Sequence, residues 1–262
     1  MTESSHRSLV VESLPVGGHR VHVVRDDLLP GGTKERAAVP YLRWLVDEGH
    51  HEFVYASPFA GFAQVALAAA ADRLGVACQL FCESDPARPG MARHEFTTLA
   101  AGFGARIELV RDLATGHRKA QRYAAAPGRY QVPLGFDDER FRKLMAAELT
   151  SAWHQLRDQI GGSPRRLWLP VGSGTLANCF RSAIGDDVRL LCVDVRVLPT
   201  GDGRLTEIAG WSNAELQRAP QAFAEPASPP PPVPSNAHYD AKLWQFITAA
   251  GRDGDVWWNV AR

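Results

Sequence analysis

The chain has 262 residues, of which 45% are hydrophobic and 22% are charged, and its 29 basic and 29 acidic residues leave no formal net charge. This length and composition suit one large domain or two small ones with an ordinary apolar core. The sequence contains no long basic run, which argues against a nucleic-acid surface, and no apolar stretch of about 18 residues, which argues against a membrane-spanning helix.

The N-terminal residues and the cysteines favour a cytoplasmic protein. Residues 1–15 lack the charged-then-apolar layout of a secretory signal. The four cysteines, Cys78, Cys82, Cys179 and Cys192, lie in apolar segments, and no His or Cys pair near them completes a zinc site. We therefore expect reduced, mostly buried thiols and no metal.

Strand-like and helix-like segments alternate along most of the chain. Apolar, β-branched runs predict strands at 20–25, 52–57, 76–84 and 105–112. Helical patterns are predicted at 33–48, 63–74, 91–101, 116–126 and 138–160. A strand, a Gly-rich turn, a helix and another strand follow over 165–198. This alternation is typical of an α/β fold with mostly parallel strands.

Two features interrupt the pattern. In the helix predicted at 33–48, with Thr33 as its N-cap and Gly49 as its stop, Pro40 is expected to break or bend the helix. After Val195 the alternation fails, and residues 220–234 contain seven prolines, which excludes a helix or a central strand there. A helix over 237–251 and a strand over 255–260 are predicted to end the chain.

The stretch RDDLLPGGTKERA, residues 25–37, places Lys34 directly after a Pro-Gly-Gly turn. The chain has 25 arginines and only four lysines, so a lysine at this turn suggests a need for something other than charge. A lysine amine can lose its proton when it is desolvated and then act as a nucleophile, whereas a guanidinium cannot. The alternative is a solvated turn lysine without a chemical role.

A second motif, VGSGT at residues 171–175, lies between a predicted strand and a predicted helix. Glycines let the backbone approach a ligand, the helix start offers free N–H groups, and the Ser173 and Thr175 hydroxyls add donors, as in a phosphate cradle. The motif lacks the lysine of a Walker loop and the third glycine of a dinucleotide fingerprint. The alternative is a tight turn that uses glycine for its geometry alone.

One phosphate cradle and one lysine after an early strand together suggest pyridoxal 5'-phosphate. Its phosphate would lie at the helix N-terminus, and its aldehyde would form a Schiff base with Lys34. A parallel α/β fold can bring these two distant motifs together.

These motifs resemble the fold type II (tryptophan synthase β-like) pyridoxal-phosphate enzymes, above all the branch with 1-aminocyclopropane-1-carboxylate deaminase and D-cysteine desulfhydrase. VRDDLLPGGTKERA is similar to the lysine motif of that branch, with Thr33 in place of the usual Asn. The resemblance implies two three-layer α/β/α lobes and a Schiff base on Lys34. It also implies phosphate binding by Gly172, Ser173, Gly174 and Thr175.

The end of the chain resembles the same family. HYDAKLWQFI is similar to the family's late Y-x-G-K helix, which implies that Tyr239 faces the cofactor pocket; a buried aromatic is the alternative. The last strand ends in NVAR, where the family has Thr-Gly-Gly or Ser-Gly with a hydroxyl facing the pyridine nitrogen. Asn259 is the candidate for that position.

The substrate loop departs from the family. Family members read Ser-x-Asn-His or Ser-Asn before the Ala-rich helix, and this Asn bonds the phenolic oxygen of the cofactor while the loop holds the substrate carboxylate. Here Phe62 and Ala63 take the Asn and His positions. Ser57 and Gln64 are the candidates to substitute through a shifted loop that includes Gly61; an altered substrate is the alternative.

Asp26 and Asp27 are adjacent in the lysine motif. Neighbours on a strand point to opposite faces, so they are not expected to form a catalytic carboxylate pair. We expect one of them to pair with a basic residue and the other to cap the turn.

The resemblance implies a large cofactor-binding lobe of residues 1–45 and 128–262, a small lobe of residues 46–127, and an extended Pro-rich segment at 220–235. It also suggests a homodimer. The predicted function is a pyridoxal-phosphate-dependent enzyme that removes the α-proton of a small amino acid, with Lys34 as the general base, and then carries out elimination, replacement or deamination. The alternative is a degenerate member that acts as a binding or partner protein, favoured by Phe62 and the short 195–239 region.

Overall fold

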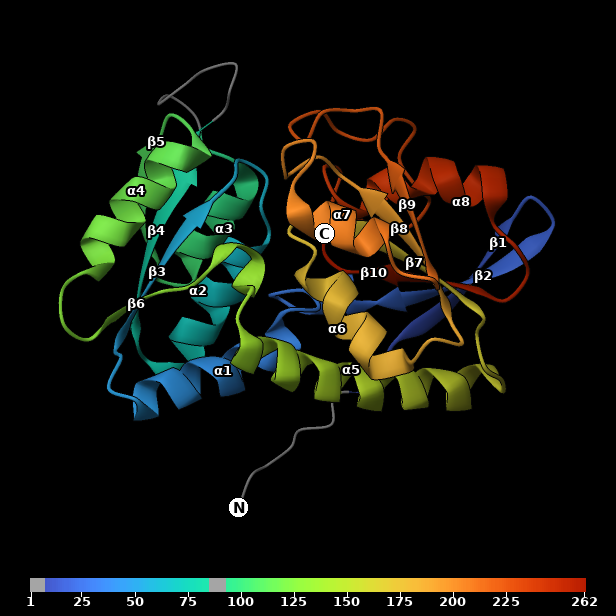
Figure 1. Cartoon of the computed structure of the whole chain (residues 1–262), viewed down its shortest axis with the longest axis horizontal. Helices are drawn as coiled ribbons and strands as arrows, with labels where there is room; N and C mark the ends of the chain where they lie inside the picture. Colours follow the sequence, from blue (N-terminus) through green and yellow to red (C-terminus); the bar gives the residue numbers. More distant parts are fainter. Residues whose placement is uncertain (1–7, 85–92) are drawn as a thin grey trace.

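The computed structural model describes residues 8–84 and 93–262, which form two β-sheets packed between helices (Figure 1). Sheet A has the strand order β1-β2-β10-β7-β8-β9, and sheet B has the order β5-β4-β3-β6. All neighbouring strands are parallel except the hairpin pair β1 and β2. The predicted α/β class with mostly parallel strands is therefore confirmed.

The bounds of the elements are as follows. Sheet A contains β1 (Val11–Val16), β2 (His19–Arg25), β7 (Arg166–Val171), β8 (Arg189–Asp194), β9 (Ala214–Arg218) and β10 (Asp255–Asn259). Sheet B contains β3 (Glu52–Ser57), β4 (Ala77–Glu83), β5 (Arg106–Val110) and β6 (Arg129–Gln131). The α-helices are α1 (Glu35–Asp47), α2 (Ala63–Leu74), α3 (Glu95–Gly102), α4 (Leu113–Ala124), α5 (Glu139–Ile160), α6 (Thr175–Ile184), α7 (Gly203–Ala209) and α8 (Trp244–Ala250). Short 3-10 turns are η1 (Asp26–Leu28), η2 (Leu134–Phe136) and η3 (Asp240–Leu243).

Sheet A is covered on both faces, as a parallel sheet requires. Trp257 and Trp258 are neighbours on β10 and therefore point to opposite sides. The Trp258 ring packs on Phe180 of α6 with ring centroids 4.7 Å apart, and the Trp257 ring lies 6.3 Å from that of Trp244 of α8. The pair of tryptophans thus anchors one helix on each face of the sheet.

Sheet B follows the same logic. Val54 and Ala56 of β3 belong to a small core cluster with α4, whereas Phe53 and Tyr55 belong to the main core with α2. Figure 1 shows α4 and α2 on opposite sides of this sheet. No helix in residues 8–84 and 93–262 is long and apolar enough to cross a membrane.

The structure corrects the start of the first helix. α1 begins at Glu35, so Lys34 takes the N-cap position, and no side chain caps the helix. The predicted cap, Thr33, is wrong because its hydroxyl instead accepts a hydrogen bond from Trp258 Nε1 at 3.2 Å. Pro40 lies inside α1 without breaking it, at the cost of one missing N–H donor.

Two other helices shift relative to the prediction. The helix expected at 91–101 is α3, which starts at Glu95; residues 91–92 lie outside the described residues. α4 starts at Leu113 because the Asp112 side chain accepts a hydrogen bond from Thr115 N at 2.7 Å and caps the helix. A capping residue therefore decides this boundary, and the sequence analysis overlooked it.

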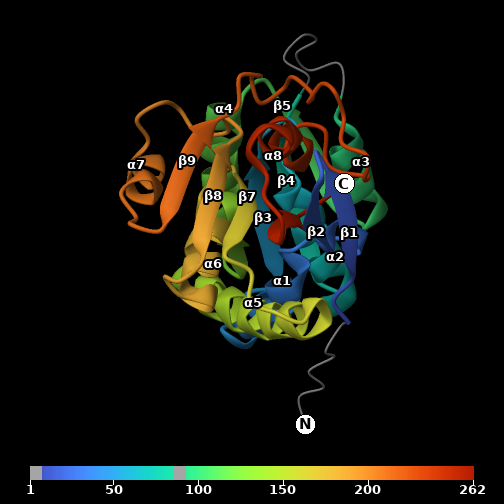
Figure 2. The same cartoon turned by 90° about the vertical axis from the view of Figure 1, so that its right-hand side faces the viewer.

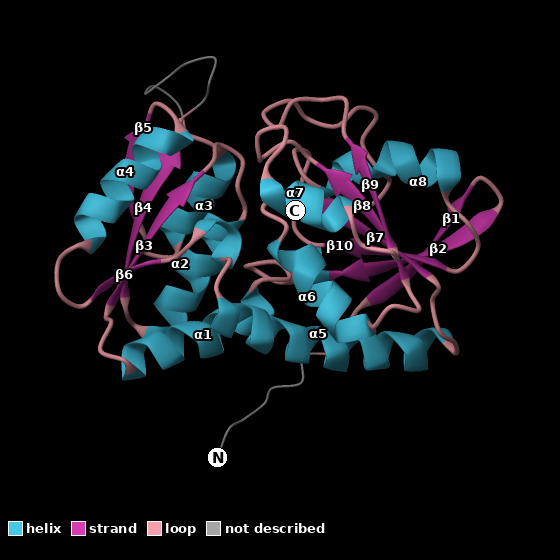
Figure 3. Cartoon of the chain, viewed as in Figure 1, coloured by secondary structure: helices cyan, strands magenta, loops and turns pink. Residues whose placement is uncertain are grey.

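The prediction that the alternation fails after Val195 is wrong. α7 and β9 add a further helix and strand at one edge of sheet A, opposite the unpredicted strand β1 at the other edge (Figure 2). β9 escaped detection because edge strands stay partly exposed and this one reads AELQR, without an apolar run. The connection from β9 to η3, residues 219–239, contains neither helix nor strand (Figure 3).

The proposed lobe boundaries stay a prediction. Sheet B itself runs from residue 52 to residue 131, and sheet A is built from both ends of the chain. All four cysteines are buried and free, as expected. Burial raises the pKa of the Cys82, Cys179 and Cys192 thiols to about 12, which makes them poor nucleophiles.

Asp26 and Asp27 lie on the turn η1 rather than on a strand, and each pairs with an arginine. Asp26 binds the guanidinium of Arg36 on α1, with an Nε–Oδ2 distance of 2.9 Å, and accepts a hydrogen bond from Trp258 Nε1 at 2.8 Å. Asp27 accepts two hydrogen bonds from Arg25, at 2.7 and 2.9 Å. We expected one aspartate to pair with a basic residue and the other to cap the turn, but both pair with an arginine.

We predict that Asp26→Ala lowers the free energy of unfolding by about 3–5 kcal/mol, because it leaves the buried guanidinium of Arg36 without its partner. Urea denaturation followed by circular dichroism measures this loss. Glu139→Ala removes the exposed ion pair with Lys143 and should leave the unfolding midpoint nearly unchanged. Equal shifts in the two variants would contradict the prediction.

Candidate active site

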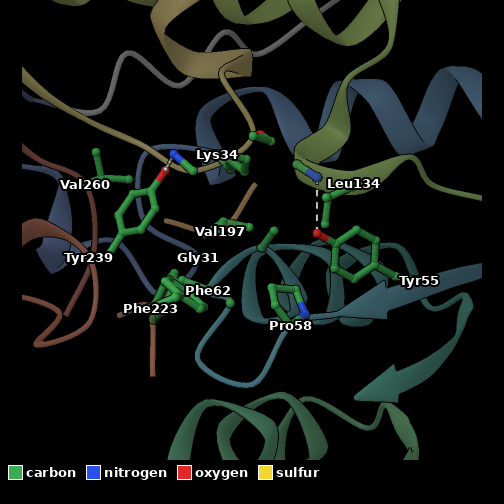
Figure 4. A pocket seen from close by; sticks show the side chains of 15 residues that line it. Gly31, Lys34, Tyr55, Pro58, Phe62, Leu134, Val197, Phe223, Tyr239 and Val260 are labelled. Atoms are coloured by element: carbon green, nitrogen blue, oxygen red, sulfur yellow. Dashed lines mark hydrogen bonds between the residues drawn. The ribbon is translucent and has the colours of Figure 1, made fainter. Parts of the chain in front are cut away.

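One cavity lies where elements of the two sheets meet, and it opens to solvent. Its wall contains Lys34, Gly172, Ser173, Tyr239 and Val260 from the part of the chain that builds sheet A. The facing wall contains Tyr55, Pro58, Gly61, Phe62 and Ala63 from β3 and the start of α2. Gly31, Leu134, Gly135, Val197 and Phe223 complete the lining (Figure 4).

The turn before Lys34 needs glycine for physical reasons. Gly32 has φ +63°, and a Cβ there would lie 2.4 Å from the carbonyl oxygen of Val260. Gly31 N donates to Glu35 Oε2 at 2.7 Å, and Thr33 N donates to Val260 O at 3.0 Å. The Pro-Gly-Gly turn therefore lets the chain pass close to the end of β10, which sets Lys34 into the cavity wall.

Lys34 is in an environment that favours a neutral amine. Removal from water lowers the pKa of Lys34 to about 8, although Cys179, Asp240 and Asp137 act in the opposite direction. Among the described residues, none makes a hydrogen bond to the amine. The Lys34 amine therefore lines a cavity, is partly deprotonated near neutral pH and makes no hydrogen bond to a described residue. Such an amine is available for covalent chemistry.

The Gly-rich turn faces the same cavity. Gly172 and Ser173 line it, Gly174 has φ +85° before the first residue of α6, and the Ser173 and Thr175 hydroxyls lie 3.0 Å apart. Gly135 approaches from η2, where a Cβ would come within 1.9 Å of Ser173 Oγ. The turn is therefore a cradle of N–H and hydroxyl groups at the start of a ten-residue helix.

Two tyrosines close the sides of this cradle. The Tyr239 hydroxyl accepts a hydrogen bond from Gly172 N, and the Tyr55 hydroxyl accepts one from Gly135 N, both at 3.1 Å (Figure 4). Burial raises the pKa of both phenols, so both stay protonated at neutral pH. Each hydroxyl still has a proton to donate to a group in the cavity.

The residues present fit pyridoxal 5'-phosphate. A phosphate suits the helix start, where the backbone at Gly135 and Gly172 packs so closely on Ser173 and Tyr239 that a Cβ at either glycine would collide with them. An aldehyde suits the desolvated amine of Lys34, which lines the same cavity.

Seven of the ten predicted site residues line the cavity or adjoin it. Lys34, Gly61, Gly172, Ser173 and Tyr239 line the cavity. Gly174 and Thr175 adjoin them at the first turn of α6.

Three other candidates do not line the cavity. Ser57 Oγ donates to the Pro58 carbonyl at 3.1 Å. Gln64 is buried between Cys82 and Thr97, which both donate to its Oε1, at 3.1 and 3.0 Å. Asn259 donates to the Pro234 carbonyl at 2.8 Å. These contacts are local, but Asn259 Oδ1 has no hydrogen-bond partner among the described residues, and the roles of all three residues in binding stay predictions.

Phe62 and Ala63 instead form the cavity wall at the positions that depart from the family. The Phe62 ring packs edge-on against Phe96 of α3 with centroids 5.0 Å apart. An apolar ring lines the cavity at this position, and within the described part of the chain neither Ser57 nor Gln64 lines it.

Sequence reasoning missed several residues of the site. Tyr55, Gly135 and Phe223 carry no local signal, because each enters the cavity through tertiary packing. Asp240 is fully buried and accepts hydrogen bonds from Val260 N and Ala261 N, at 2.7 and 3.1 Å, and burial raises its pKa well above the usual range. Its place beside Tyr239 in the late helix motif was a signal that could have found it.

Most of the chain matches a known family of enzymes. Residues 10–242 match the family model described as pyridoxal-phosphate dependent enzyme. No protein of curated function is significantly similar to the chain in sequence.

Several solved structures share the fold at low identity. A structure described as an ACC deaminase homologue superposes with a TM-score of 0.73 at 16% identity, over 97% of this chain and 89% of that one. The L-serine ammonia-lyase of the fungus Rhizomucor miehei gives 0.67 at 15% identity, over 97% and 93%. The diaminopropionate ammonia lyase of Escherichia coli gives 0.71 at 11% identity, over 98% and 85%. The expected fold type II architecture is thereby confirmed.

We predict that Lys34 reacts with acetic anhydride at a rate that rises with pH and reaches half of its maximum near pH 8. Only the neutral amine is acylated, and desolvation lowers the pKa of Lys34 from 10.5 to about 8. Peptide mass spectrometry after brief labelling measures the rate, with the exposed Lys143 as the internal reference. Parallel pH profiles for the two lysines would show that the Lys34 amine is not desolvated.

Proposed function

Because the chain belongs to the family of pyridoxal-phosphate-dependent enzymes, its cofactor is pyridoxal 5'-phosphate, and we propose that it acts on a small amino acid through Lys34. The proposed reaction is removal of the α-proton followed by elimination, replacement or deamination. The bound cofactor supplies an electron sink for the bond that breaks at the α-carbon.

One observation carries the proposal: the desolvated amine of Lys34 and the phosphate cradle at Gly172–Thr175 line or adjoin a single cavity. The proposed role of Lys34 is to hold the aldehyde carbon of the cofactor and, once released from it, to accept the α-proton. A pKa of about 8 suits both tasks, since an appreciable share of the amine is neutral near pH 7–8.

The other polar groups have positioning roles in this proposal. The cradle holds the phosphate through the N–H groups at the start of α6 and the Ser173 hydroxyl. Tyr55 and Tyr239 stay neutral and donate hydrogen bonds without adding negative charge. Phe62 and the rest of the apolar wall exclude water, which keeps the amine desolvated.

The cofactor attachment has a direct test. We expect purified protein to show a visible absorption band, and borohydride reduction followed by peptide mapping to place the adduct on Lys34. Lys34→Ala should lose the covalent adduct, whereas Lys143→Ala, which removes an exposed lysine of α5, should keep it. A colourless protein that takes up no added pyridoxal 5'-phosphate would refute the enzyme reading and favour the degenerate binding protein.

A second prediction concerns the cradle. Gly135→Ala should reduce cofactor affinity at least about tenfold, because its Cβ would come within 1.9 Å of Ser173 Oγ and force that hydroxyl to move. Equilibrium dialysis with pyridoxal 5'-phosphate measures the affinity. The matched control is Gly161→Ala at the end of α5, which has a similar positive φ of +68° but no atom within 4 Å of the added Cβ. If both variants lose affinity equally, backbone strain rather than the cradle is responsible.

The reaction class draws support from the amino-acid lyases and the deaminase homologue that share the fold, but low identity leaves the substrate open. A homodimer and a cytoplasmic location stay predictions. Gel filtration coupled to light scattering tests the first of these.

A further inference from the structure

The Pro-rich connection between β9 and η3 begins with a short stretch that a buried lysine holds in place. Lys242 has a fully buried side chain, and its amine donates to the carbonyl oxygens of Ala222 and Phe223 at 2.7 and 3.4 Å. The same amine lies 5.7 Å from the centre of the Phe223 ring. A buried ammonium needs such acceptors, because without them its desolvation would be strongly unfavourable.

A histidine also contacts the start of the Pro-rich connection. His238 Nδ1 lies 3.3 Å from the carbonyl oxygen of Phe223. The His238 ring also lies near the rings of His94 and of Phe59 in the β3–α2 loop, with centroids 5.2 and 6.2 Å away. The carbonyl of Phe223 is therefore held by two side chains of the late helix motif, one of which touches the β3–α2 loop.

The side chain that these contacts hold is part of the cavity wall. Phe223 lines the cavity, whereas Lys242 does not. In Figure 4, Phe223 and Pro58 lie on the side of the cavity away from Lys34. Lys34 and the cradle account for the two ends of the cofactor, so this remaining side is available to the side chain of a substrate.

The chemistry of that side is uniform. Pro58 and Phe223 are apolar, as are Phe62 beside Gly32 and Val197 beside Gly172, and among the described lining residues only the Lys34 amine is charged at neutral pH. A charged substrate side chain would lose its water there without gaining a partner, whereas an apolar one would bury surface favourably.

We propose that Lys242 is a positioning residue that fixes the start of the Pro-rich connection, so that Phe223 forms the wall that selects substrates with an apolar, uncharged side chain. This inference rests on the proposed function. It also gives the connection a role: its first residues belong to the substrate site, although its prolines lie in an exposed loop.

The test uses the full-length protein loaded with pyridoxal 5'-phosphate and four variants: Phe223→Ala, Lys242→Met, the double variant, and Lys143→Met as the control on an exposed lysine. The probes are both enantiomers of norleucine, alanine, glutamate and lysine. Apparent dissociation constants come from the change in the visible spectrum of the cofactor on titration.

We expect the wild type to bind norleucine at least tenfold more tightly than glutamate or lysine. Phe223→Ala should weaken the binding of norleucine about tenfold and the binding of alanine less than twofold. Lys242→Met should reproduce this selective loss, and the double variant should lose no more than either single variant, because both changes remove the same wall. Equal weakening of all probes by Lys242→Met, or additive losses in the double variant, would overturn the positioning role.

A second measurement needs neither cofactor nor substrate. Amide hydrogen exchange in residues 219–225 should accelerate at least tenfold in Lys242→Met, stay unchanged in Lys143→Met, and be restored in part by Lys242→Gln, which keeps a donor. Unchanged exchange in Lys242→Met would overturn the inference even if the protein is an enzyme.

The two proposals fail in different ways. The wild type could bind the cofactor on Lys34 and yet prefer charged probes or show no preference. That result would refute the proposed selectivity for apolar side chains but not the proposed function. A wild type that takes up no cofactor would refute both the proposed function and the substrate selectivity. The hydrogen-exchange result would then test only whether Lys242 holds residues 219–225 in place.

Discussion

The site depends on one buried carboxylate. Asp26 is almost fully buried at the end of β2, and it must bind Arg36 and Trp258 to offset its lost hydration. These three residues come from η1, α1 and β10, so their contact brings the beginning and the end of the chain together. The turn between Asp26 and Arg36 is thereby closed over the end of β10. Gly32 and Thr33 complete that closure at the Val260 carbonyl, and the position of Lys34 follows from it.

The local motifs were predictable because their meaning is contained in a few adjacent residues. The Pro-Gly-Gly-Thr-Lys turn and the Gly-Ser-Gly-Thr turn each combine a backbone requirement with a chemical group, and both lie where the sequence analysis expected them, at one cavity. What the sequence did not reveal was non-local. Tyr55 and Gly135 meet across 80 positions of the chain, and Tyr239 meets Gly172 across 67. No periodicity or spacing encodes such pairs, since they result from the packing of η2 against β3 and of η3 against β7.

The errors in the expected elements have equally specific causes. Pro40 removes one donor, but the packing of α1 between α2 and α5 outweighs that loss, so the helix continues. β9 was missed because an edge strand needs no apolar run. Gln64 is polar and close to the departing loop, yet its Oε1 accepts hydrogen bonds from Cys82 and Thr97 in the core. In each case burial and partners, which only the fold reveals, decided the role.

Lys34 and Lys242 show how the surroundings of a lysine decide between a structural and a chemical role. Burial lowers the pKa of Lys34 and of Lys242 to about 8 in both cases. The Lys242 amine donates to two carbonyl oxygens and lies outside the cavity wall, so its protons are committed to holding the chain. The Lys34 amine lines the cavity and has no such acceptor among the described residues, so the same loss of water leaves it ready to react. The arginine-rich composition is consistent with this contrast. A guanidinium could not easily replace the Lys242 amine between its two carbonyl oxygens, and it could not replace the reactive amine of Lys34.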